Sequence, residues 1–330
     1  MKKIGINGFG RIGRYVARTV LDTSDVEVAV VNDLADINTL AHLFKYDSVH
    51  RQLKHSFKIE GDQLFFENGK KIVFTQHKDP QLIPWKKHNV EIVIESTGLF
   101  RDKESAAQHL TAGAKKVIIS APAQSEGIKS VVLGVNEAII SPNDMIISNA
   151  SCTTNSAAPM IKVIRSLCEI ESAYITTIHS YTSDQRLHDA PHKDLRRARA
   201  AAESIVPTTT GAAKAISEIF PDLKKRIGGC GIRVPVPNGS LTDLSITVKG
   251  KVPTIEEINS AFKNASQNDL KGILSYIEDP IVSSDIISNP YSCIFDSLLT
   301  STVGNMIKIV GWYDNEAGYS NRLIELVQKL

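Results

Sequence analysis

The sequence has few cysteines, few aromatic residues and almost no net charge, and each scarcity excludes a class of protein. Its four cysteines show no regular spacing, and no Cys/His pair has zinc-site spacing, so neither a disulfide scaffold nor a metal site is expected. A formal net charge of +2 over 330 residues is too small to indicate nucleic acid or an anionic membrane as the partner. No run approaches the ~20 apolar residues of a membrane helix, and polar residues interrupt any signal core near the N-terminus. We therefore expect a cytoplasmic protein without a membrane anchor.

What the sequence does contain begins with a glycine-rich turn. Lys3–Asn7 is typical of a buried strand, and Arg14–Leu21 repeats apolar residues at helical spacing. Between them lies Gly8-x-Gly10-x-x-Gly13, the context that a dinucleotide fingerprint requires. Gly8 would allow the tight turn, Gly10 would let the backbone approach a pyrophosphate, and Gly13 would let the helix pack on the strand.

An acidic residue follows at the spacing that this fingerprint demands. A second predicted strand starts at Val26 and ends at Asp33, which lies 20 residues beyond Gly13. A carboxylate at this place can accept hydrogen bonds from the ribose hydroxyls, and it repels the 2′-phosphate of NADP. The first half therefore predicts a nicotinamide or flavin dinucleotide site, and the acid favours NAD.

The remainder of the first half predicts a doubly wound sheet. Strands are expected at Glu91–Glu95, Lys116–Ser120 and Met145–Ser148, with antiparallel hairpins at the sheet edge within residues 50–90. Ligands of such sheets lie beyond the carboxyl ends of the strands. On this basis Thr97, Gly98 and Ser120 are further candidate cofactor contacts, although the spacing fits simple loop residues nearly as well.

A cysteine near the midpoint is the candidate nucleophile. Cys152 lies among small hydroxylated residues before an apolar run that ends near Leu167. A helix N-terminus carries partial positive charge, which lowers the pKa of a thiol there. His179, in a predicted strand over Tyr174–Tyr181, is the candidate base. The alternatives are a buried packing cysteine and a structural histidine. Pro159 leaves the helix start open, either at Cys152 with a bend or nearer Asn155.

The second half also contains possible anion sites. The basic stretch His192–Arg199 fits a solvated or subunit-facing loop, a nucleic-acid contact, or a clamp for a small phosphorylated ligand. Thr210 and Gly211 precede a predicted helix over Ala212–Ile219, which is an anion-binding arrangement. Arg233 lies in an apolar strand, where a buried charge needs an anionic partner.

The remaining elements predict a second domain with a different architecture. Strands are expected from Leu241, near Ser292–Phe295 and at Met306–Tyr313, and helices at Thr254–Ala265 and Leu323–Leu330. We therefore expect a mostly antiparallel sheet covered by helices.

Taken in order, these motifs resemble the phosphorylating glyceraldehyde-3-phosphate dehydrogenase family over essentially the whole chain. The motifs that carry the resemblance are Asn7–Gly13, Ala150–Asn155, His179–Thr182, Arg196–Ala202, Arg233–Val236 and Trp312–Glu316. The resemblance implies an α/β protein with a Rossmann-type NAD domain over residues 1–150, completed by a C-terminal helix at about 316–330. An α+β catalytic domain would cover residues 151–315. It also implies a homotetramer whose core is lined by residues 181–202.

The resemblance implies a covalent mechanism. Cys152 would attack the aldehyde of glyceraldehyde 3-phosphate, and His179 would activate the thiol and act as base. Hydride transfer to NAD would leave a thioester, which inorganic phosphate would cleave to 1,3-bisphosphoglycerate. Catalysis would be helped by an oxyanion contact from the Cys152 backbone N–H.

The resemblance also assigns binding residues. The implied cofactor contacts, besides Gly8, Gly10, Gly13, Thr97 and Gly98, are Arg11, Ile12, Asp33, Lys78, Ser120 and Asn315. The implied substrate-phosphate residues are Thr182, Asp184 and Arg233. The implied residues for the attacking phosphate are Ser151, Thr153, Arg197, Thr210 and Gly211, with Arg197 also fitting the other phosphate.

Departures from the family pattern keep some alternatives open. Ser156 stands where many relatives have a second cysteine, which excludes an intrachain disulfide with Cys152. Ala317 replaces a common tryptophan. Ala190-Pro191 stands where many NAD-specific relatives have Leu-Pro and NADP-using plastid relatives have Ala-Ser. Because this pair shares one residue with each, use of NADP stays open despite Asp33. The rival activity is erythrose-4-phosphate dehydrogenase, and a secondary nucleic-acid role rests only on the basic stretch.

Overall fold

The computed structural model describes all 330 residues, which fold into two compact units. The first unit comprises Met1–Val131, Ala138–Ala150 and Ser320–Leu330, and the second comprises Val132–Glu137 and Ser151–Tyr319. Each unit has its own sheet and its own buried apolar side chains. None of the helices combines the length and the apolar character needed to span a bilayer.

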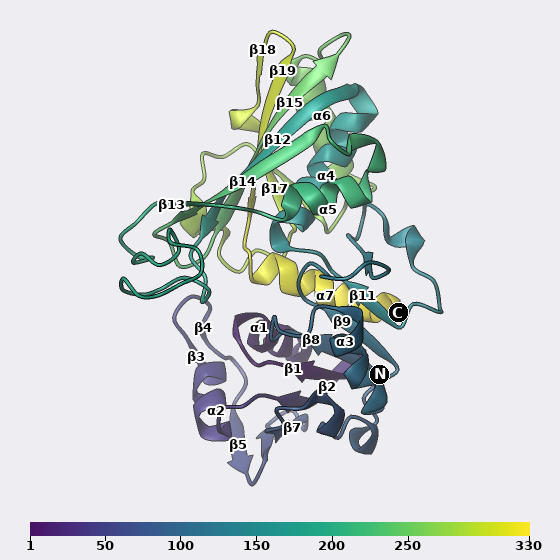
Figure 1. Ribbon diagram of the computed structural model, residues 1–330, viewed down its shortest axis with the longest axis vertical. Coiled ribbons are helices and arrows are strands. Elements are labelled where there is room, and N and C mark those ends of the chain that lie inside the picture. Colours follow the sequence, from purple (N-terminus) through teal and green to yellow (C-terminus); the bar gives the residue numbers. More distant parts are fainter. The chain divides into compact units, whose positions relative to one another are not determined.

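The sheet of the first unit has nine strands in the order β10-β11-β9-β8-β1-β2-β7-β6-β5 (Figure 1). The strands from β10 to β7 are all parallel, whereas β6 and β5 continue the edge as antiparallel hairpins. The strand bounds are β1 (Lys2–Asn7), β2 (Val26–Asn32), β5 (Phe57–Glu60), β6 (Gln63–Phe66), β7 (Lys71–Thr75), β8 (Ile92–Glu95), β9 (Lys116–Ile119), β10 (Lys129–Ser130) and β11 (Ile146–Ser148). A separate small hairpin joins β3 (Tyr46–Asp47) and β4 (Arg51–Gln52). The predicted doubly wound sheet with edge hairpins is confirmed.

Helices of the first unit cover this sheet. They are α1 (Arg11–Leu21), α2 (Ile37–Lys45) and α3 (Lys103–Thr111), of which α1 contacts β2 and α3 contacts β9 and β11. The central strands are buried on both faces, which explains why they appear in the sequence as continuous apolar runs rather than alternating ones.

The sheet of the second unit has eight strands and is mixed (Figure 1). Its main order is β13-β14-β12-β15-β19-β17-β16, with β18 paired to β19, and only the β12–β14 and β16–β17 pairs are parallel. The strands are β12 (Glu169–Ser180), β13 (Val206–Thr208), β14 (Ile227–Val234), β15 (Ser240–Lys249), β16 (Leu274–Ile277), β17 (Cys293–Asp296), β18 (Ser301–Val303) and β19 (Met306–Tyr313). The prediction of a largely antiparallel second sheet is confirmed.

Three helices pack against this second sheet. They are α4 (Cys152–Leu167), α5 (Ala212–Ile219) and α6 (Ile255–Gln267), and α4 contacts four strands as well as both other helices. A capping box begins α6, because Thr254 accepts from the N–H of Glu257 while the Glu257 carboxylate accepts from the N–H of Thr254.

The structure defines the first residues of two helices, α4 and α7, which periodicity in the sequence did not fix. α4 begins at Cys152, where the hydroxyl of Ser151 accepts from the N–H of Thr154 at 3.0 Å. Pro159 lies inside this helix, and the buried side chains around it show that packing outweighs the lost backbone hydrogen bond. α7 (Ala317–Lys329) begins six residues before Leu323, the start that periodicity predicts, and close to the start at about 316 that the resemblance implies. The side chain of Asp314 accepts from the N–H groups of Glu316 and Ala317 at this start.

Short 3₁₀ helices complete the chain. They are η1 (Pro80–Leu82), η2 (Lys86–His88), η3 (Glu137–Ile139), η4 (Pro221–Leu223), η5 (Ser283–Ile286) and η6 (Ser297–Leu299).

Candidate active site and cofactor site

The first unit places its candidate cofactor residues where the strand order reverses. The chain proceeds from β1 to β2 on one side, while β8 pairs with β1 on the other side. Asn7 and Glu95, the last residues of β1 and β8, stand opposite each other in register. Dinucleotides bind at this kind of switch point, beyond the carboxyl ends of the strands.

The glycine loop after β1 has the geometry that only glycine permits. Gly8 has φ of +92°, and a Cβ there would lie 2.7 Å from the backbone nitrogen of Thr97. A Cβ on Gly13 would lie 2.2 Å from the carbonyl oxygen of Gly8, so helix α1 approaches the strand end closely. Gly10 is exposed and stands at the N-terminal cap of α1 without a capping side chain. This arrangement gives a bound pyrophosphate access to the backbone.

Asp33 faces the same loop. Its Oδ2 accepts from the N–H of Phe9 at 2.7 Å and its Oδ1 accepts from the N–H of Ala35 at 3.1 Å. An ionised carboxylate has about four acceptor positions, so two backbone contacts leave room for ribose hydroxyls. The side chain is partly exposed, as such a role requires.

Arg11 is engaged by a carboxylate. Its guanidinium donates to both oxygens of Asp47, at 2.5 and 3.1 Å. Burial raises the pKa of Asp47, but hydrogen bonds from Arg11 and from the N–H groups of His50 and Val49 outweigh burial and lower the pKa to about 2. Arg11 therefore has a fixed orientation next to the glycine loop.

The other predicted cofactor residues lie at the same edge of the first sheet, except one. Ile12 is in the first turn of α1, Thr97 and Gly98 follow β8, Ser120 follows β9, and Lys78 is exposed beyond β7. Asn315 lies in the second unit, where its Oδ1 accepts from Ser180 and Ser240, both at 2.9 Å.

In the second unit, the structure brings together the predicted nucleophile and base. Cys152 is the first residue of α4 and His179 lies near the end of β12. The Sγ atom of Cys152 is 3.4 Å from Nε2 of His179. Cys152 is partly exposed, whereas His179 is 6% exposed. The nucleophile therefore borders solvent while the imidazole is held by the protein.

The electrostatics of this pair differ from the sequence-based prediction of a lowered thiol pKa. Burial raises the pKa of Cys152, and the charge of Arg233 and a hydrogen bond from the N–H of Thr153 oppose that rise. Burial and the charge of Arg233 lower the pKa of His179 to about 3, against the effect of the Ser180 carbonyl. At neutral pH the pair is therefore a thiol and a neutral imidazole, and the imidazole is able to accept a proton.

The second ring nitrogen of His179 has two close polar neighbours. Nδ1 lies 2.7 Å from the carbonyl oxygen of Ser180 and 2.5 Å from Nη1 of Arg233, which itself donates to the Ser180 carbonyl at 2.9 Å. The Ser180 carbonyl can only accept and the Arg233 guanidinium can only donate, so these two neighbours favour opposite tautomers of His179. The tautomer with its proton on Nδ1, donated to the Ser180 carbonyl, leaves Nε2 unprotonated and facing Cys152, as a general base requires.

Tyr313 is a residue of this site that sequence reasoning missed. Its hydroxyl is 3.0 Å from Oγ1 of Thr153 and 2.8 Å from Oγ1 of Thr177. Its ring packs edge-on against the imidazole of His179, with 6.0 Å between centroids. Burial raises the pKa of Tyr313, so the hydroxyl keeps its proton. Tyr313 lies in the Trp312–Glu316 motif, but the motif assigned it no role, because only the β15–β19 pairing and the packing of α4 bring it here.

Hydrogen bonds connect some of the residues predicted to bind the two phosphates. Nη1 of Arg197 donates to Asp184, and Nε of Arg197 donates to Thr208 at 2.9 Å. Asp184 and Arg197, assigned to different phosphates, are thus directly paired. Thr210 accepts from the N–H of Ala212 at the start of α5, next to exposed Gly211. Thr182 is partly buried, and its carbonyl accepts from the N–H of Gln185.

The thiols of the chain are all unpaired. Cys152, Cys168, Cys230 and Cys293 are free. Ser156, one turn along α4 from Cys152, is buried, and its Oγ pairs with Oγ1 of Thr242 at 3.0 Å.

Comparison with known proteins shows the family to which this chain belongs. Residues 151–315 match the family model described as the C-terminal domain of glyceraldehyde 3-phosphate dehydrogenase, and residues 2–103 match the NAD binding domain of the same enzyme. The chain belongs to the glyceraldehyde-3-phosphate dehydrogenase family. The enzyme class, the NAD cofactor and the glycolytic oxidative phosphorylation of glyceraldehyde 3-phosphate that the sequence predicted are thereby confirmed.

Curated relatives agree with the glyceraldehyde-3-phosphate dehydrogenase models. A glyceraldehyde-3-phosphate dehydrogenase of Geobacillus stearothermophilus is 53% identical over 326 residues, which cover 98% of this chain and 96% of the relative. "Glyceraldehyde-3-phosphate dehydrogenase 1" of Bacillus subtilis is also 53% identical over 326 residues, with the same coverage. "Glyceraldehyde-3-phosphate dehydrogenase 2" of Streptomyces avermitilis is 54% identical over 327 residues, covering 98% of this chain and 97% of the relative.

The position of Arg233 predicts the pH dependence of Cys152 reactivity. Because the positive charge of Arg233 lowers the thiol pKa, Arg233→Met is expected to raise it. The folded thiol of the variant then ionises at higher pH. Because iodoacetamide reacts with the thiolate, alkylation is expected to be slower at every pH at which part of the Cys152 thiol is still protonated. The measurement is the alkylation rate of Cys152 as a function of pH, by mass spectrometry.

The matched control is Arg226→Met in the same unit, since Arg226 hydrogen-bonds to Asp222 and Ile170. This control should leave the alkylation profile unchanged. A profile for Arg233→Met that coincides with wild type, or moves to lower pH, would contradict the assigned charge effect.

Proposed function

We propose that the chain oxidises and phosphorylates glyceraldehyde 3-phosphate through a thioester on Cys152, with His179 as the proton acceptor. The observation that carries this proposal is the 3.4 Å contact between Sγ of Cys152 and Nε2 of His179 at the start of α4. A covalent thioester retains the oxidation energy that hydrolysis would lose.

The first step forms a carbon–sulfur bond. The sulfur of Cys152 attacks the aldehyde carbon, and the thiol proton passes to Nε2 of the neutral His179. The N–H of Cys152 together with His179 stabilises the developing oxyanion, which then takes the proton back from His179 and becomes a hydroxyl. The product is a hemithioacetal on Cys152.

The second step oxidises this carbon, and the third releases the product. Bound NAD supplies the hydride acceptor. His179 takes the hydroxyl proton while the carbon loses hydride, which leaves a thioester on Cys152. An oxygen of inorganic phosphate then attacks the thioester carbon, the carbon–sulfur bond breaks, and 1,3-bisphosphoglycerate leaves while the sulfur of Cys152 takes the proton that His179 holds.

We assign the two phosphates to two sets of side chains. Thr182, Asp184 and Arg233 would hold the substrate phosphate, and Ser151, Thr153, Arg197, Thr210 and Gly211 would hold the attacking phosphate. The pairing of Arg197 with Asp184 supports a single connected region rather than two isolated ones. Arg233 would have two roles, since it would bind the substrate phosphate and its guanidinium also contacts the imidazole of His179.

We assign the predicted cofactor contacts within each unit by itself. Gly8, Gly10, Arg11, Ile12, Gly13, Asp33, Lys78, Thr97, Gly98 and Ser120 belong to the first unit. The oxygen of the Asn315 side chain accepts from two hydroxyls, so its NH₂ group is the end that would donate to the carboxamide oxygen of nicotinamide. We assign the cofactor domain to residues 1–150 with the helix at about 316–330, and the catalytic domain to 151–315.

We also propose a cytoplasmic homotetramer. Leu187 and Leu195, in the predicted subunit-facing segment 181–202, are 76% and 82% exposed in the single chain. Burial of these two side chains against a partner would remove apolar surface from water, which favours association. A buried subunit contact also accounts for the basic stretch His192–Arg199 without a nucleic acid.

The mechanism predicts that turnover depends on inorganic phosphate. Steady reduction of NAD by glyceraldehyde 3-phosphate is expected only with phosphate or arsenate present, because nothing else cleaves the thioester at a comparable rate. Spectrophotometric assays with glyceraldehyde 3-phosphate and erythrose 4-phosphate, with and without phosphate, make the comparison. Equal rates without phosphate, or faster turnover of erythrose 4-phosphate, would favour the rival enzyme.

Cys152→Ala is expected to lower kcat by at least roughly 1,000-fold, since it removes the covalent step. The NAD affinity, measured by isothermal titration calorimetry, should stay within about twofold. Cys168→Ala serves as the control for loss of a partly exposed thiol, and it should keep full activity. Appreciable activity in Cys152→Ala would rule out the thioester.

Asp33→Asn is expected to reduce the preference for NAD over NADP by roughly tenfold, because it removes a negative charge that repels the 2′-phosphate. The matched control is Asp36→Asn, three residues along the same loop, where the acid caps α2. The ratio of kcat/KM for the two cofactors is the readout. A ratio that changes equally in both variants would show that Asp33 has no special part in cofactor selection.

A further inference from the structure

The side-chain amide of Asn315 is held at one end only. Its Oδ1 lies 2.9 Å from the Ser180 hydroxyl at the end of β12 and 2.9 Å from the Ser240 hydroxyl at the start of β15. Its Nδ2 makes no hydrogen bond within the chain and is not sealed from solvent. The proposed mechanism uses this amide but gives neither serine a role.

Both hydroxyls are buried, and each has a single acceptor. Ser180 is 0% exposed and Ser240 is 1% exposed, and the only acceptor within hydrogen-bonding distance of either hydroxyl is Oδ1 of Asn315. The Ser240 oxygen already accepts from the backbone N–H of Ser180 at 3.2 Å, so its own proton is left to be donated. A buried hydroxyl proton without an acceptor is costly.

These two hydroxyls determine which way the amide points. With the amide turned by 180°, Nδ2 would face both serines, and neither hydroxyl proton would have an acceptor. The observed orientation satisfies both protons. The oxygen of Asn315 is therefore the end held by the protein, and the NH₂ group is the end left for a ligand.

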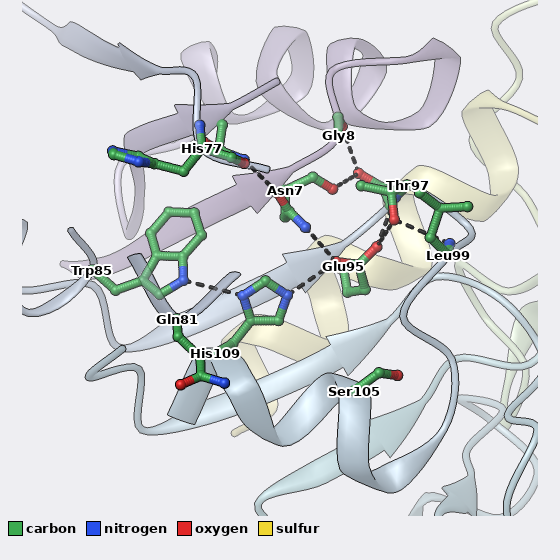
Figure 2. Close-up of polar contacts among 12 residues, drawn as sticks. Asn7, Gly8, His77, Gln81, Trp85, Glu95, Thr97, Leu99, Ser105 and His109 are labelled. Atoms are coloured by element: carbon green, nitrogen blue, oxygen red, sulfur yellow. Dashed lines mark hydrogen bonds and ion pairs between the residues drawn. The ribbon is translucent and has the colours of Figure 1, made fainter. Parts of the chain in front are cut away.

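A buried polar cluster in the first unit lacks such an open end. Figure 2 shows Glu95 between Asn7, Thr97 and His109, with Trp85 on the far side of the imidazole. Both side-chain oxygens of Glu95 have partners in this cluster, and Nδ1 of His109 accepts from the Trp85 indole at 3.1 Å. These side chains pair with one another, whereas the network around Asn315 ends in a free donor.

The backbone on either side of Asn315 is also fixed. Oδ1 of the buried Asp314 accepts from the N–H groups of Glu316 and Ala317, both at 2.8 Å. Oδ2 of Asp314 accepts from the N–H of Ser288 at 2.7 Å. With backbone and amide both held, the donor has its position before a ligand arrives, which lowers the entropy lost on binding.

We propose that Ser180 and Ser240 are positioning residues that preorganise the Asn315 amide as a hydrogen-bond donor for the carboxamide oxygen of nicotinamide. The inference rests on the proposed NAD contact of Asn315. It specifies an acceptor on the ligand, since a donor there would meet another donor. Because the serines act through Asn315, neither needs to touch the cofactor.

The test compares the binding of NAD with that of ADP-ribose, which lacks the nicotinamide ring. In Ser180→Ala/Ser240→Ala the amide loses both partners, so the ligand has to order it. The ratio of the NAD Kd to the ADP-ribose Kd, by isothermal titration calorimetry, is expected to rise roughly fivefold, the size associated with immobilising one side chain. General damage to the nucleotide site would weaken both ligands and leave the ratio unchanged.

Thr242→Val is the matched control. Thr242 lies two residues along β15 from Ser240 and is 0% exposed, but its hydroxyl donates to Ser156. Its ratio should equal that of wild type. A milder variant, Ser180→Ala, keeps the Ser240 hydroxyl and the bond to it from the backbone N–H, so it is expected to show a smaller rise. This variant takes the place of the double variant if the latter does not fold, as judged by its thermal midpoint.

A double-mutant cycle tests whether the serines act through Asn315. Asn315→Ala should raise the ratio by itself, because it removes the donor. In that background Ser180→Ala should add nothing to the ratio, since residues that act as one unit are not additive.

The outcomes separate the inference from the function on which it rests. A raised ratio in the serine variants, with Thr242→Val like wild type and no further rise in the Asn315→Ala background, supports the proposal. A ratio that is unchanged in the serine variants, that rises equally in Thr242→Val, or that responds to Ser180→Ala without Asn315 overturns it. An unchanged ratio in Asn315→Ala would overturn it at an earlier step, because the carboxamide contact itself would be wrong. Failure of wild type to bind NAD would contradict the proposed function, and the inference with it.

Discussion

The hydroxyl of Tyr313 joins the three segments on which the active site depends. It hydrogen-bonds to Thr153, the residue after Cys152, and to Thr177, two residues before His179. These contacts tie the first turn of α4 to β12 from the end of β19, and the ring of Tyr313 supports the imidazole. The distance between sulfur and imidazole is therefore set by a residue distant in sequence from both.

The charge on Arg233 is the second determinant of this site. It is placed so that its positive field reaches the thiol and the imidazole together, lowering the pKa of each. For the thiol this favours the reactive anion, and for the histidine it favours the neutral base. Burial opposes the first effect and reinforces the second, so the free site holds a neutral pair that is ready for proton transfer on arrival of the aldehyde.

Local patterns in the sequence predict much of this protein. The glycine turn, Asp33 and the positions of most strands follow from spacing and periodicity, because these features depend on residues that are close in the chain. The structure adds reasons that spacing cannot supply, such as the approach of Thr97 to Gly8 that makes a side chain impossible there. The start of α4 was open in the sequence because Pro159 opposes a longer helix, and the Ser151 cap and the packing of buried side chains decided it.

What could not be predicted depends on long-range contacts. Tyr313 looks like an ordinary strand residue, and Glu95 like the end of an apolar strand, until the sheets and α3 place their partners around them. The pKa of Cys152 was predicted in the wrong direction because helix position is a local property, whereas desolvation depends on everything that packs around the sulfur. Asn315 and the phosphate residues are placed in the structure, but their roles remain predictions.

Ser156 has a consequence for the redox chemistry of the nucleophile. A sulfenic acid formed on Cys152 can be protected from further oxidation if a neighbouring thiol condenses with it. The position one helical turn away offers instead a hydroxyl that is already paired with Thr242. Recovery of an oxidised Cys152 therefore has to come from a thiol supplied by the surrounding solution, which ties the enzyme's survival under oxidant to the reducing capacity of its compartment.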